Sequence, residues 1–190
     1  PGTTERFMTS YEVENTINID DPALYEPLDI ILPVIKEAME ADKAVELKYA
    51  DDHASLANMW KNKHGEVNSL KALRVAEKKA AQEQELRTWI NANSERQEKY
   101  GKCLDKIEKI CKGVDAAATK TFMNANICLM SSPTLLTAWR LRNSVKLEEK
   151  QKSFSEEKIA KVLEQYENGV KDKDVNTEVK VILATLKTWE

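Results

Sequence analysis

Apolar residues recur along most of the chain with the 3.6-residue period of an α-helix, and the stretch from Ala41 to Gly65 shows this pattern most clearly. One face of this expected helix carries Val45, Tyr49, Leu56, Met59, Trp60 and Lys63. A second face carries the polar or small residues Asp51, Ala54, Asn58, Lys61 and Asn62. We therefore expect a helix that packs on its apolar side and leaves Asn58 on a polar face.

The same period predicts helices on both sides of this stretch. Thr9 and Glu12 match a capping box that starts a short helix reaching about residue 18. The segment 20–22 is expected to end that helix and begin the next, in which Pro33 should mark either a kink or the true start. Gly65 is expected to stop the central helix. The later predicted helices cover about 69–91, 100–113, 114–130, 133–152, 153–169 and 176–189.

Three details of these later helices are specific enough to be checked in a structure. The Ala-rich stretch 114–130 is expected to be fully buried. Ser132 and Pro133 should cap and begin the following helix, with Trp139 facing inward. Ser153 and Glu156 match a second capping box.

Composition supports a chain that is almost wholly helical. Of the 190 residues 32% are charged, and only five are Gly and five Pro. No stretch of 20 to 50 residues repeats, so a helical solenoid is not supported. We expect an all-α fold, an irregular bundle of about seven to nine helices.

Charge and hydropathy exclude some partners. The net charge is -3 with both signs interspersed, which argues against nucleic acid or an anionic membrane as the main partner. No apolar run approaches the roughly 18 to 20 residues of a membrane span. The chain begins Pro1-Gly2 without a Met and ends without a helix cap, so we expect it to be an excised piece of a longer protein.

Cysteine and histidine usage predicts neither a metal nor another cofactor. The three cysteines, Cys103, Cys111 and Cys128, form no CxxC pair, and only His53 and His64 could add ligands. Cys103 and Cys111 lie eight residues apart on an expected helix, about 12 Å along its axis, which is too far for a disulfide. Buried free thiols are the expected state.

Catalytic motifs are missing from the sequence. It contains no GxSxG elbow, P-loop, GxGxxG or HExxH motif. Asp52 and His53 are neighbours on a helix and point about 100 degrees apart, so they cannot act together. We therefore expect no catalytic residue in this chain, with both histidines in solvent. Asn58 is the one candidate for substrate binding, because an amide oxygen accepts hydrogen bonds and an amide nitrogen donates two.

Three phrases of the sequence carry a family resemblance: PGTTERFMTSYEVE, KYADDHASLANMWKNKHG and LKALRVAEKKAAQEQELRTWINANSERQEKYG. Together they resemble the bacterial dipeptidyl-peptidases of serine peptidase family 46, of the dipeptidyl-peptidase 7 and 11 type. The resemblance covers roughly residues 1–112, and beyond Gly113 it rests on helical character alone. Met59 departs from the family pattern, which has an aromatic residue there, and this should alter packing beside Asn58 more than the role of Asn58.

The resemblance implies a helical domain inserted between the two β-barrels of a chymotrypsin-like peptidase, at the periplasm or cell surface. Residues 1–8 would then connect to the missing catalytic domain, and residues 9–190 would form the cap over the active-site cleft. Family members release dipeptides from free peptide N-termini, and the family's terminal-amine ligand matches Asn58. The catalytic His, Asp and Ser belong to the barrels, so the isolated chain is expected to be inactive.

The implied partners are peptides with a free N-terminus and the catalytic β-barrel domain of the same polypeptide, and a homodimer is left open. The alternative is a non-enzymatic helical interaction module, for which the helix 70–91 should expose an apolar strip. The cap-domain interpretation instead expects a concave surface beside Asn58. A metal-binding or small-ligand bundle lacks the Glu-x-x-His pairs that it would need.

Overall fold

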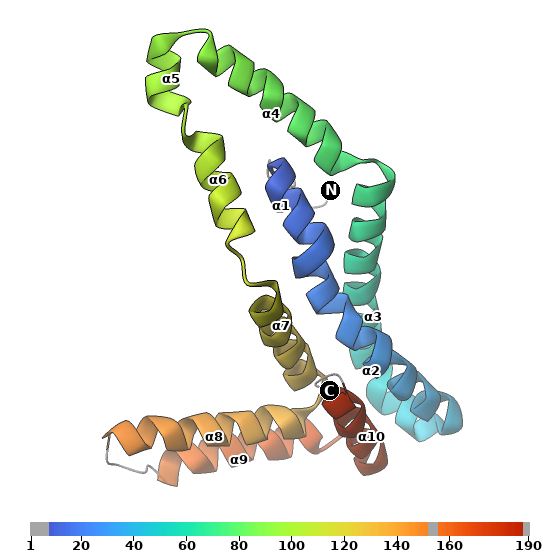
Figure 1. The fold of residues 1–190 in the computed structure, drawn as a ribbon. Coiled ribbons are helices and arrows are strands. Elements are labelled where there is room, and N and C mark those ends of the chain that lie inside the picture. Colours follow the sequence, from blue (N-terminus) through green and yellow to red (C-terminus); the bar gives the residue numbers. More distant parts are fainter. Residues whose placement is uncertain (1–7, 152–155, 188–190) are drawn as a thin grey trace. The chain divides into compact units, whose positions relative to one another are not determined.

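The computed structural model describes residues 8–151 and 156–187, and within them every regular element is a helix. The all-α class expected from the sequence is confirmed. The elements in chain order (Figure 1) are α1 (Ser10–Asn15), the π-helix η1 (Thr16–Asp20), α2 (Asp21–Ala41), α3 (Lys43–Ala72), α4 (Val75–Asn91), α5 (Ser94–Tyr100), α6 (Cys103–Lys112), α7 (Ala116–Ser131), α8 (Pro133–Gln151), α9 (Glu156–Val170) and α10 (Val175–Leu186). The described part thus has ten α-helices where seven to nine were expected, with α5 as a separate short helix before Gly101.

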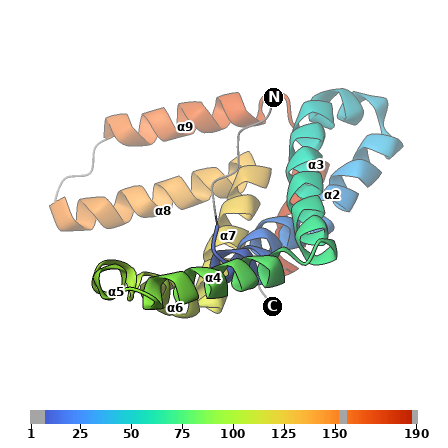
Figure 2. The same cartoon turned by 90° about the horizontal axis from the view of Figure 1, so that it is seen from above.

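The chain divides into two compact units. The first contains the described residues of 8–23 and 61–121, and the second contains those of 24–60 and 122–187. α1 and α4 to α6 therefore lie in the first unit, and α8 to α10 lie in the second. Within the second unit α8 and α9 lie side by side (Figure 1 and Figure 2).

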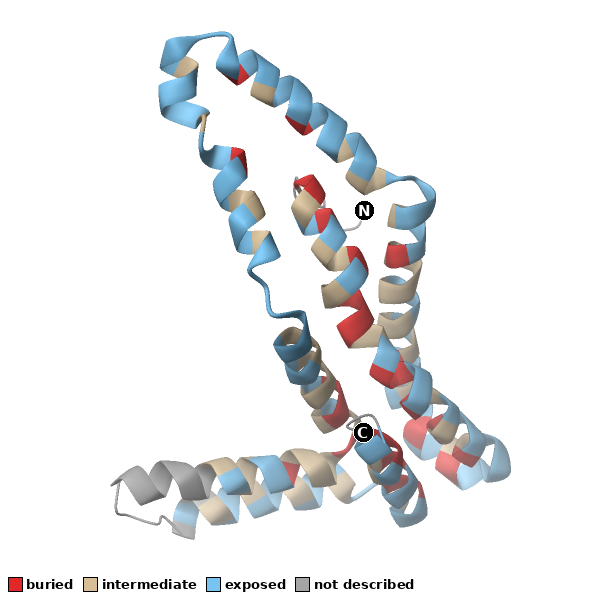
Figure 3. Ribbon diagram, viewed as in Figure 1, coloured by how far each residue is buried: buried red, intermediate tan, exposed pale blue. Residues whose placement is uncertain are grey.

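The hydrophobic core of the second unit is built mainly from α2 and the first half of α3. Its members are fully or almost fully buried (Figure 3): Leu28, Ile31, Ile35 and Ala38 of α2, Val45, Tyr49 and Leu56 of α3, Ile127 of α7 and Val181 of α10. These side chains fix one face of α3. Because helical residues at such spacings share a face, the opposite side of α3 is left for solvent or a ligand.

Pro33 does not mark the beginning of a helix, because α2 runs without interruption from Asp21 through Pro27 and Pro33 to Ala41. A helix-interior proline costs about 3 kcal/mol. Burying one Leu or Ile side chain gives roughly 1.5 to 3 kcal/mol. The buried residues Leu28 and Ile31 lie between the two prolines of this helix, and their burial offsets much of the cost.

The capping box that begins α1 is confirmed, since the Thr9 backbone N–H donates to the Glu12 carboxylate at 2.7 Å and the Glu12 N–H donates to Thr9 Oγ1 at 3.3 Å.

The helix break expected at residues 20–22 is wrong. The chain passes from α1 through the five-residue π-helix into α2 with helical backbone angles at both junctions. A π-helix inserts extra residues into a continuous helix, so good capping residues at 20–22 do not end it.

Gly65 does not stop the central helix, and neither Asn68 nor Ser69 caps a new one, because α3 continues to Ala72. Val67, two residues beyond Gly65, is buried and gives the continued helix a packing contact. The chain turns instead at Arg74, which has a φ of 52° and is the single non-glycine residue with positive φ in the described ranges. Packing of the next turn, rather than the glycine, decides where this helix ends.

Helix α7 is only partly buried, contrary to the prediction for 114–130. Phe122 and Met130 are 66% and 63% exposed, while Ile127 and Cys128 are buried. Its many alanines favour a helix but give too little apolar side chain to cover every face. Trp139, expected to face inward from α8, is about half exposed.

The predicted boundary before α8 is confirmed. Ser132 is buried and its Oγ accepts from the Leu135 N–H at 3.3 Å, and Pro133 is the first residue of the helix.

All three cysteines are free, but Cys103 is exposed and Cys111 is half-buried, so the expectation of buried thiols holds for Cys128 alone.

The capping box expected at Ser153 and Glu156 lies outside the residues whose side chains are described, and residues 1–7 of the expected connector are outside the described chain.

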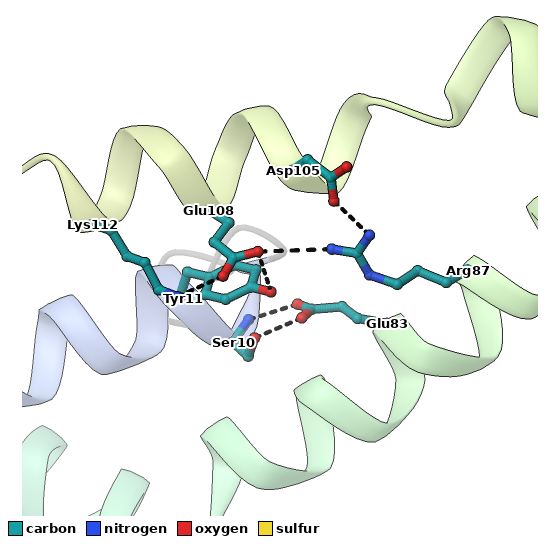
Figure 4. Close-up of polar contacts among 7 residues, drawn as sticks. All are labelled: Ser10, Tyr11, Glu83, Arg87, Asp105, Glu108 and Lys112. Carbon is teal, nitrogen blue, oxygen red and sulfur yellow. Dashed lines mark hydrogen bonds and ion pairs between the residues drawn. The ribbon is translucent and has the colours of Figure 1, made fainter.

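In the first unit a set of polar contacts joins α1 to α4 and α6 (Figure 4). Glu83 of α4 is buried, and its carboxylate accepts from both the backbone N–H and the hydroxyl of Ser10, each at 2.6 Å. The Tyr11 hydroxyl donates to Glu108 at 3.1 Å. Because a buried carboxylate requires such donors, these contacts fix the start of α1 against α4.

Candidate functional site

Asn58 lies where the sequence pattern placed it, on the exposed face of α3 in the second unit. The two faces expected for this helix are confirmed: Tyr49 and Leu56 are buried on one side, and Asp51 is exposed with Asn58 on the other. Among the described residues no hydrogen bond to the Asn58 side chain occurs. Both its oxygen and its NH₂ group are therefore open to a ligand.

Trp60 anchors α3 from the side opposite to Asn58. Its indole N–H donates to the Asp29 carboxylate of α2 at 2.7 Å, and its half-buried ring packs against the core. Met59 is also partly buried against this core. These contacts fix the rotation of α3 about its axis and so the direction of Asn58.

A cavity of about 290 Å³ opens beside the same helix. It is lined by residues of α2, α3, α7, α8 and α9 and by the turn before α10: Ile35, Tyr49, Asp52, Ser55, Leu56, Leu129, Met130, Ser131, Pro133, Leu136, Gly169 and Lys173. Ser55 is exposed and precedes Asn58 by three residues on α3, so the two side chains are neighbours on the helix surface. The cap-domain interpretation expected a concave surface beside Asn58, but the sequence did not show which residues would line it, and Asn58 itself is not one of them.

The charged groups of the cavity neutralise one another. Lys173 forms an ion pair with Asp52 of α3. The Lys173 ammonium also lies 4.7 Å from the centre of the Tyr49 ring, within cation–π range. The polar end of the cavity therefore offers no unpaired charge among these residues.

A buried carboxylate, Glu178 of α10, supports the cavity wall from behind. It accepts a hydrogen bond from Ser132 Oγ at 2.9 Å and one from the Tyr49 hydroxyl at 3.3 Å. Burial raises the pKa of Glu178 above its ordinary value, and burial together with the nearby Glu178 charge raises the pKa of Tyr49. These contacts join α10, α3 and the α7–α8 junction.

Sequence reasoning missed Glu178 because the apolar residues of its helix suggested a different buried face. Val179 and Leu183 are about half exposed, whereas Glu178 and Val181 are buried. A glutamate on a helix is usually solvated, so only its partners, far away in the sequence, reveal its role.

In the first unit Asp21 is a second buried carboxylate. Burial raises its pKa from an ordinary value near 3.8 to about 6, although the Lys63 ammonium at 3.1 Å acts in the opposite direction. Its Oδ2 is buried and has no hydrogen-bond partner among the described residues. The negative charge of the deprotonated Asp21 carboxylate is thus only partly balanced by its surroundings.

We expect Asp21→Asn to remove a pH dependence of stability. The folded state binds the Asp21 proton more tightly than the unfolded state, so the free energy of unfolding should fall as the pH rises from about 4 to about 6. The expected loss is a few kcal/mol at most, at about 1.4 kcal/mol per pKa unit. Urea unfolding of both forms at about pH 4 and about pH 8 measures it. If the free energy of unfolding changes by the same amount between the two pH values in both forms, Asp21 is not the source of the pH dependence.

Other classes of site are not seen in the described part of the chain. No group of three or more His, Cys, Asp or Glu side chains there is arranged to hold a metal ion. No helix in the described ranges is long and apolar enough to cross a membrane. His53 and His64 lie eleven residues apart on α3, about 16 Å along its axis, so they do not form one site.

Comparison with known proteins gives a consistent set of relatives. The sequence model of the family described as Peptidase S46 matches residues 1–190. A dipeptidyl-peptidase 7 from Porphyromonas endodontalis is 40% identical over 104 residues, covering 55% of this chain and 13% of the relative. A dipeptidyl-peptidase 7 from Porphyromonas gingivalis is 36% identical over 128 residues, covering 67% and 18%.

A third relative extends the similarity along the chain. An Asp/Glu-specific dipeptidyl-peptidase from Capnocytophaga gingivalis is 29% identical over 176 residues, 92% of this chain and 24% of the relative. The chain thus spans between 13% and 24% of the length of these three curated relatives.

Proposed function

The chain belongs to the peptidase S46 family, and from this premise we propose that it is the helical part of a serine dipeptidyl-peptidase in which Asn58 binds the free N-terminal ammonium of a peptide. The relatives named above are dipeptidyl-peptidases, and the chain spans less than a quarter of their length. In this proposal the catalytic triad is supplied by a β-barrel domain of the same polypeptide.

The observation that carries the proposal is the state of the Asn58 amide. It is exposed and without a hydrogen-bond partner among the described residues, on a helix that is fixed from behind. An ammonium donates three hydrogen bonds, and a rigidly held amide oxygen accepts one of them. Because the amide is neutral, a counter-charge for the ammonium would come from elsewhere in the polypeptide.

Binding the terminal ammonium explains how such an enzyme would release two residues at a time. If the ammonium is held at a fixed distance from the nucleophile, only the second peptide bond reaches the attacking group. A substrate with a blocked amine loses its positive charge and two of its donors. Such a peptide would bind weakly, and its second peptide bond would not be held at the nucleophile.

The test uses the full-length parent protein and two peptides of the same sequence, one with a free N-terminus and one acetylated. We expect mass spectrometry to show successive loss of dipeptides from the free peptide and no cleavage of the acetylated one. Equal cleavage of both peptides, or cleavage at internal bonds, would overturn the proposal.

The alternative, a non-enzymatic interaction module, has one supporting feature. Helix α4 exposes Leu86 and Trp89, as that hypothesis requires. However, the Arg96 guanidinium lies over the Trp89 ring at 4.1 Å, so the strip is partly covered within the chain. The cavity beside Asn58 favours the peptidase. A periplasmic or cell-surface location and a homodimer stay predictions.

A further inference from the structure

We propose that the exposed apolar side of α10 is a docking surface for an amphipathic helix with an acidic edge, and that this helix belongs to the part of the parent polypeptide outside residues 1–190. The surface, which we call the α10 stripe, consists of five apolar residues: Val175, Val179, Ile182, Leu183 and Leu186. The inference goes beyond the proposed function and does not depend on Asn58.

The polarity of α10 is the reverse of that of an ordinary surface helix. The residues that it buries in the second unit are mostly small or polar: Thr177, Glu178, Val181, Ala184 and Thr185. Four of the five residues of the α10 stripe are 49% to 75% exposed, and Ile182 is half-buried. A surface helix normally turns its larger apolar residues inward. A contiguous apolar face in water therefore indicates a missing partner.

Hydrogen bonds on the opposite side of α10 prevent the helix from turning to bury the stripe. Glu178 accepts from Ser132 Oγ at 2.9 Å and from the Tyr49 hydroxyl at 3.3 Å. The Asp174 carboxylate caps the helix and accepts from the Thr177 N–H at 2.8 Å. Rotation of α10 would break the two bonds to Glu178, and a buried carboxylate without donors is costly. The stripe therefore stays on the outside.

The spacing of the stripe indicates a helical partner. Val175, Val179, Ile182 and Leu186 follow one another at intervals of four, three and four residues. This is the heptad spacing by which one helix packs along another. The stripe is about 16 Å long, or three helical turns, since each residue adds about 1.5 Å to the helix. A partner helix of similar length would cover it.

The charges beside the stripe indicate which helix fits. Lys180 and Lys187 are exposed and lie seven residues apart, so they share one edge of the stripe. Glu178 is the single acidic residue of α10, and it is buried on another side. A partner with Asp or Glu along one edge would pair with both lysines. The stripe of a second copy would bring lysines alone, which disfavours pairing of two such stripes.

The parent polypeptide is the source to which we assign this helix. The chain spans between 13% and 24% of the length of its three curated relatives, so a parent of similar length would hold most of its residues outside the chain. A helix of the same polypeptide meets the stripe at a high effective concentration. The contact then forms without the affinity that a separate protein would need.

The first experiment measures thiol labelling in the full-length parent that carries Val179→Cys. We expect the introduced thiol to react with a maleimide roughly 10-fold or more slowly than an exposed thiol, because the docked helix covers it. Lys171→Cys is the matched control, since Lys171 is exposed in the turn before α10. Mass spectrometry of the labelled peptides separates the introduced thiols from the three native cysteines.

Zero-length crosslinking with a carbodiimide tests the acidic edge. This reagent joins a lysine amine to a carboxylate that touches it. We expect Lys180 or Lys187 of the otherwise unchanged parent to be joined to an Asp or Glu outside residues 1–190 of the same molecule. A variant with Lys180→Arg and Lys187→Arg keeps both charges and should lose these crosslinks.

Every other outcome overturns the proposal. Equal labelling rates in Val179→Cys and Lys171→Cys would mean that the stripe is uncovered. Crosslinks only between isotopically distinct copies would assign the stripe to a dimer, and crosslinks only within residues 1–190 would assign it to another part of this chain. Slow labelling without a crosslink from either lysine would exclude the acidic edge. None of these results bears on the cleavage of free and acetylated peptides, which tests the proposed function.

Discussion

Asn58→Ala in the full-length parent is expected to lower kcat/KM for a free-amine peptide by roughly 5- to 150-fold, which corresponds to about 1 to 3 kcal/mol. The reason is the loss of a hydrogen bond to a charged group at an amide that the rest of the chain leaves unpaired. Because the ammonium must also be positioned in the transition state, we expect KM to rise and kcat to fall. Steady-state kinetics on free and acetylated peptides measure both.

Asn62→Ala is the matched control for this variant. Asn62 is the same residue type, is also exposed, and lies one turn further along the polar face of α3. Neither Asn58 nor Asn62 lines the cavity, but Asn58 is one turn closer to the lining residue Ser55. A loss of similar size in Asn62→Ala, or no loss in Asn58→Ala, would remove Asn58 from the substrate site.

Ile31→Ala is expected to lower the free energy of unfolding by about 2 to 5 kcal/mol. Ile31 of α2 is 0% exposed at the centre of the second unit's core, against the first half of α3. Shortening its side chain removes buried apolar surface and leaves a cavity that the packed helices fill only in part. The loss is measured by urea unfolding of the chain, followed by circular dichroism.

The adjacent residue gives a control with the same chemistry. Ile30 is 39% exposed on the same helix, so Ile30→Ala should change the free energy of unfolding by no more than about 1 kcal/mol. Comparable losses for the two variants would contradict the orientation of α2. That orientation matters for function, because α2 supplies both the core under α3 and Asp29, the partner of Trp60.

Local signals predicted the helix starts well. The Thr9–Glu12 capping box and the Ser132–Pro133 boundary both occur as expected. Each depends on hydrogen bonds between residues at most three apart, so the sequence contains all the information.

Helix interruptions were predicted poorly. Gly65 and the segment 20–22 were expected to end helices, and a helix start was one of the two expectations for Pro33, yet helical structure continues through each. The intrinsic penalty at such residues is about 1 to 3 kcal/mol, comparable to the burial of a single apolar side chain. Whether the next turn finds a packing partner is therefore decisive, and that partner lies elsewhere in the chain.

The sequence alone determined the all-α class, the two faces of α3 and the exposure of Asn58, because helical periodicity is a property of neighbouring residues. The cavity beside Asn58 was decided by the tertiary structure. Lys173 pairs with Asp52 from 121 residues away, and Glu178 reaches Tyr49 across 129. No local pattern encodes such contacts, since they exist only once α3, α8 and α10 have packed around the same space.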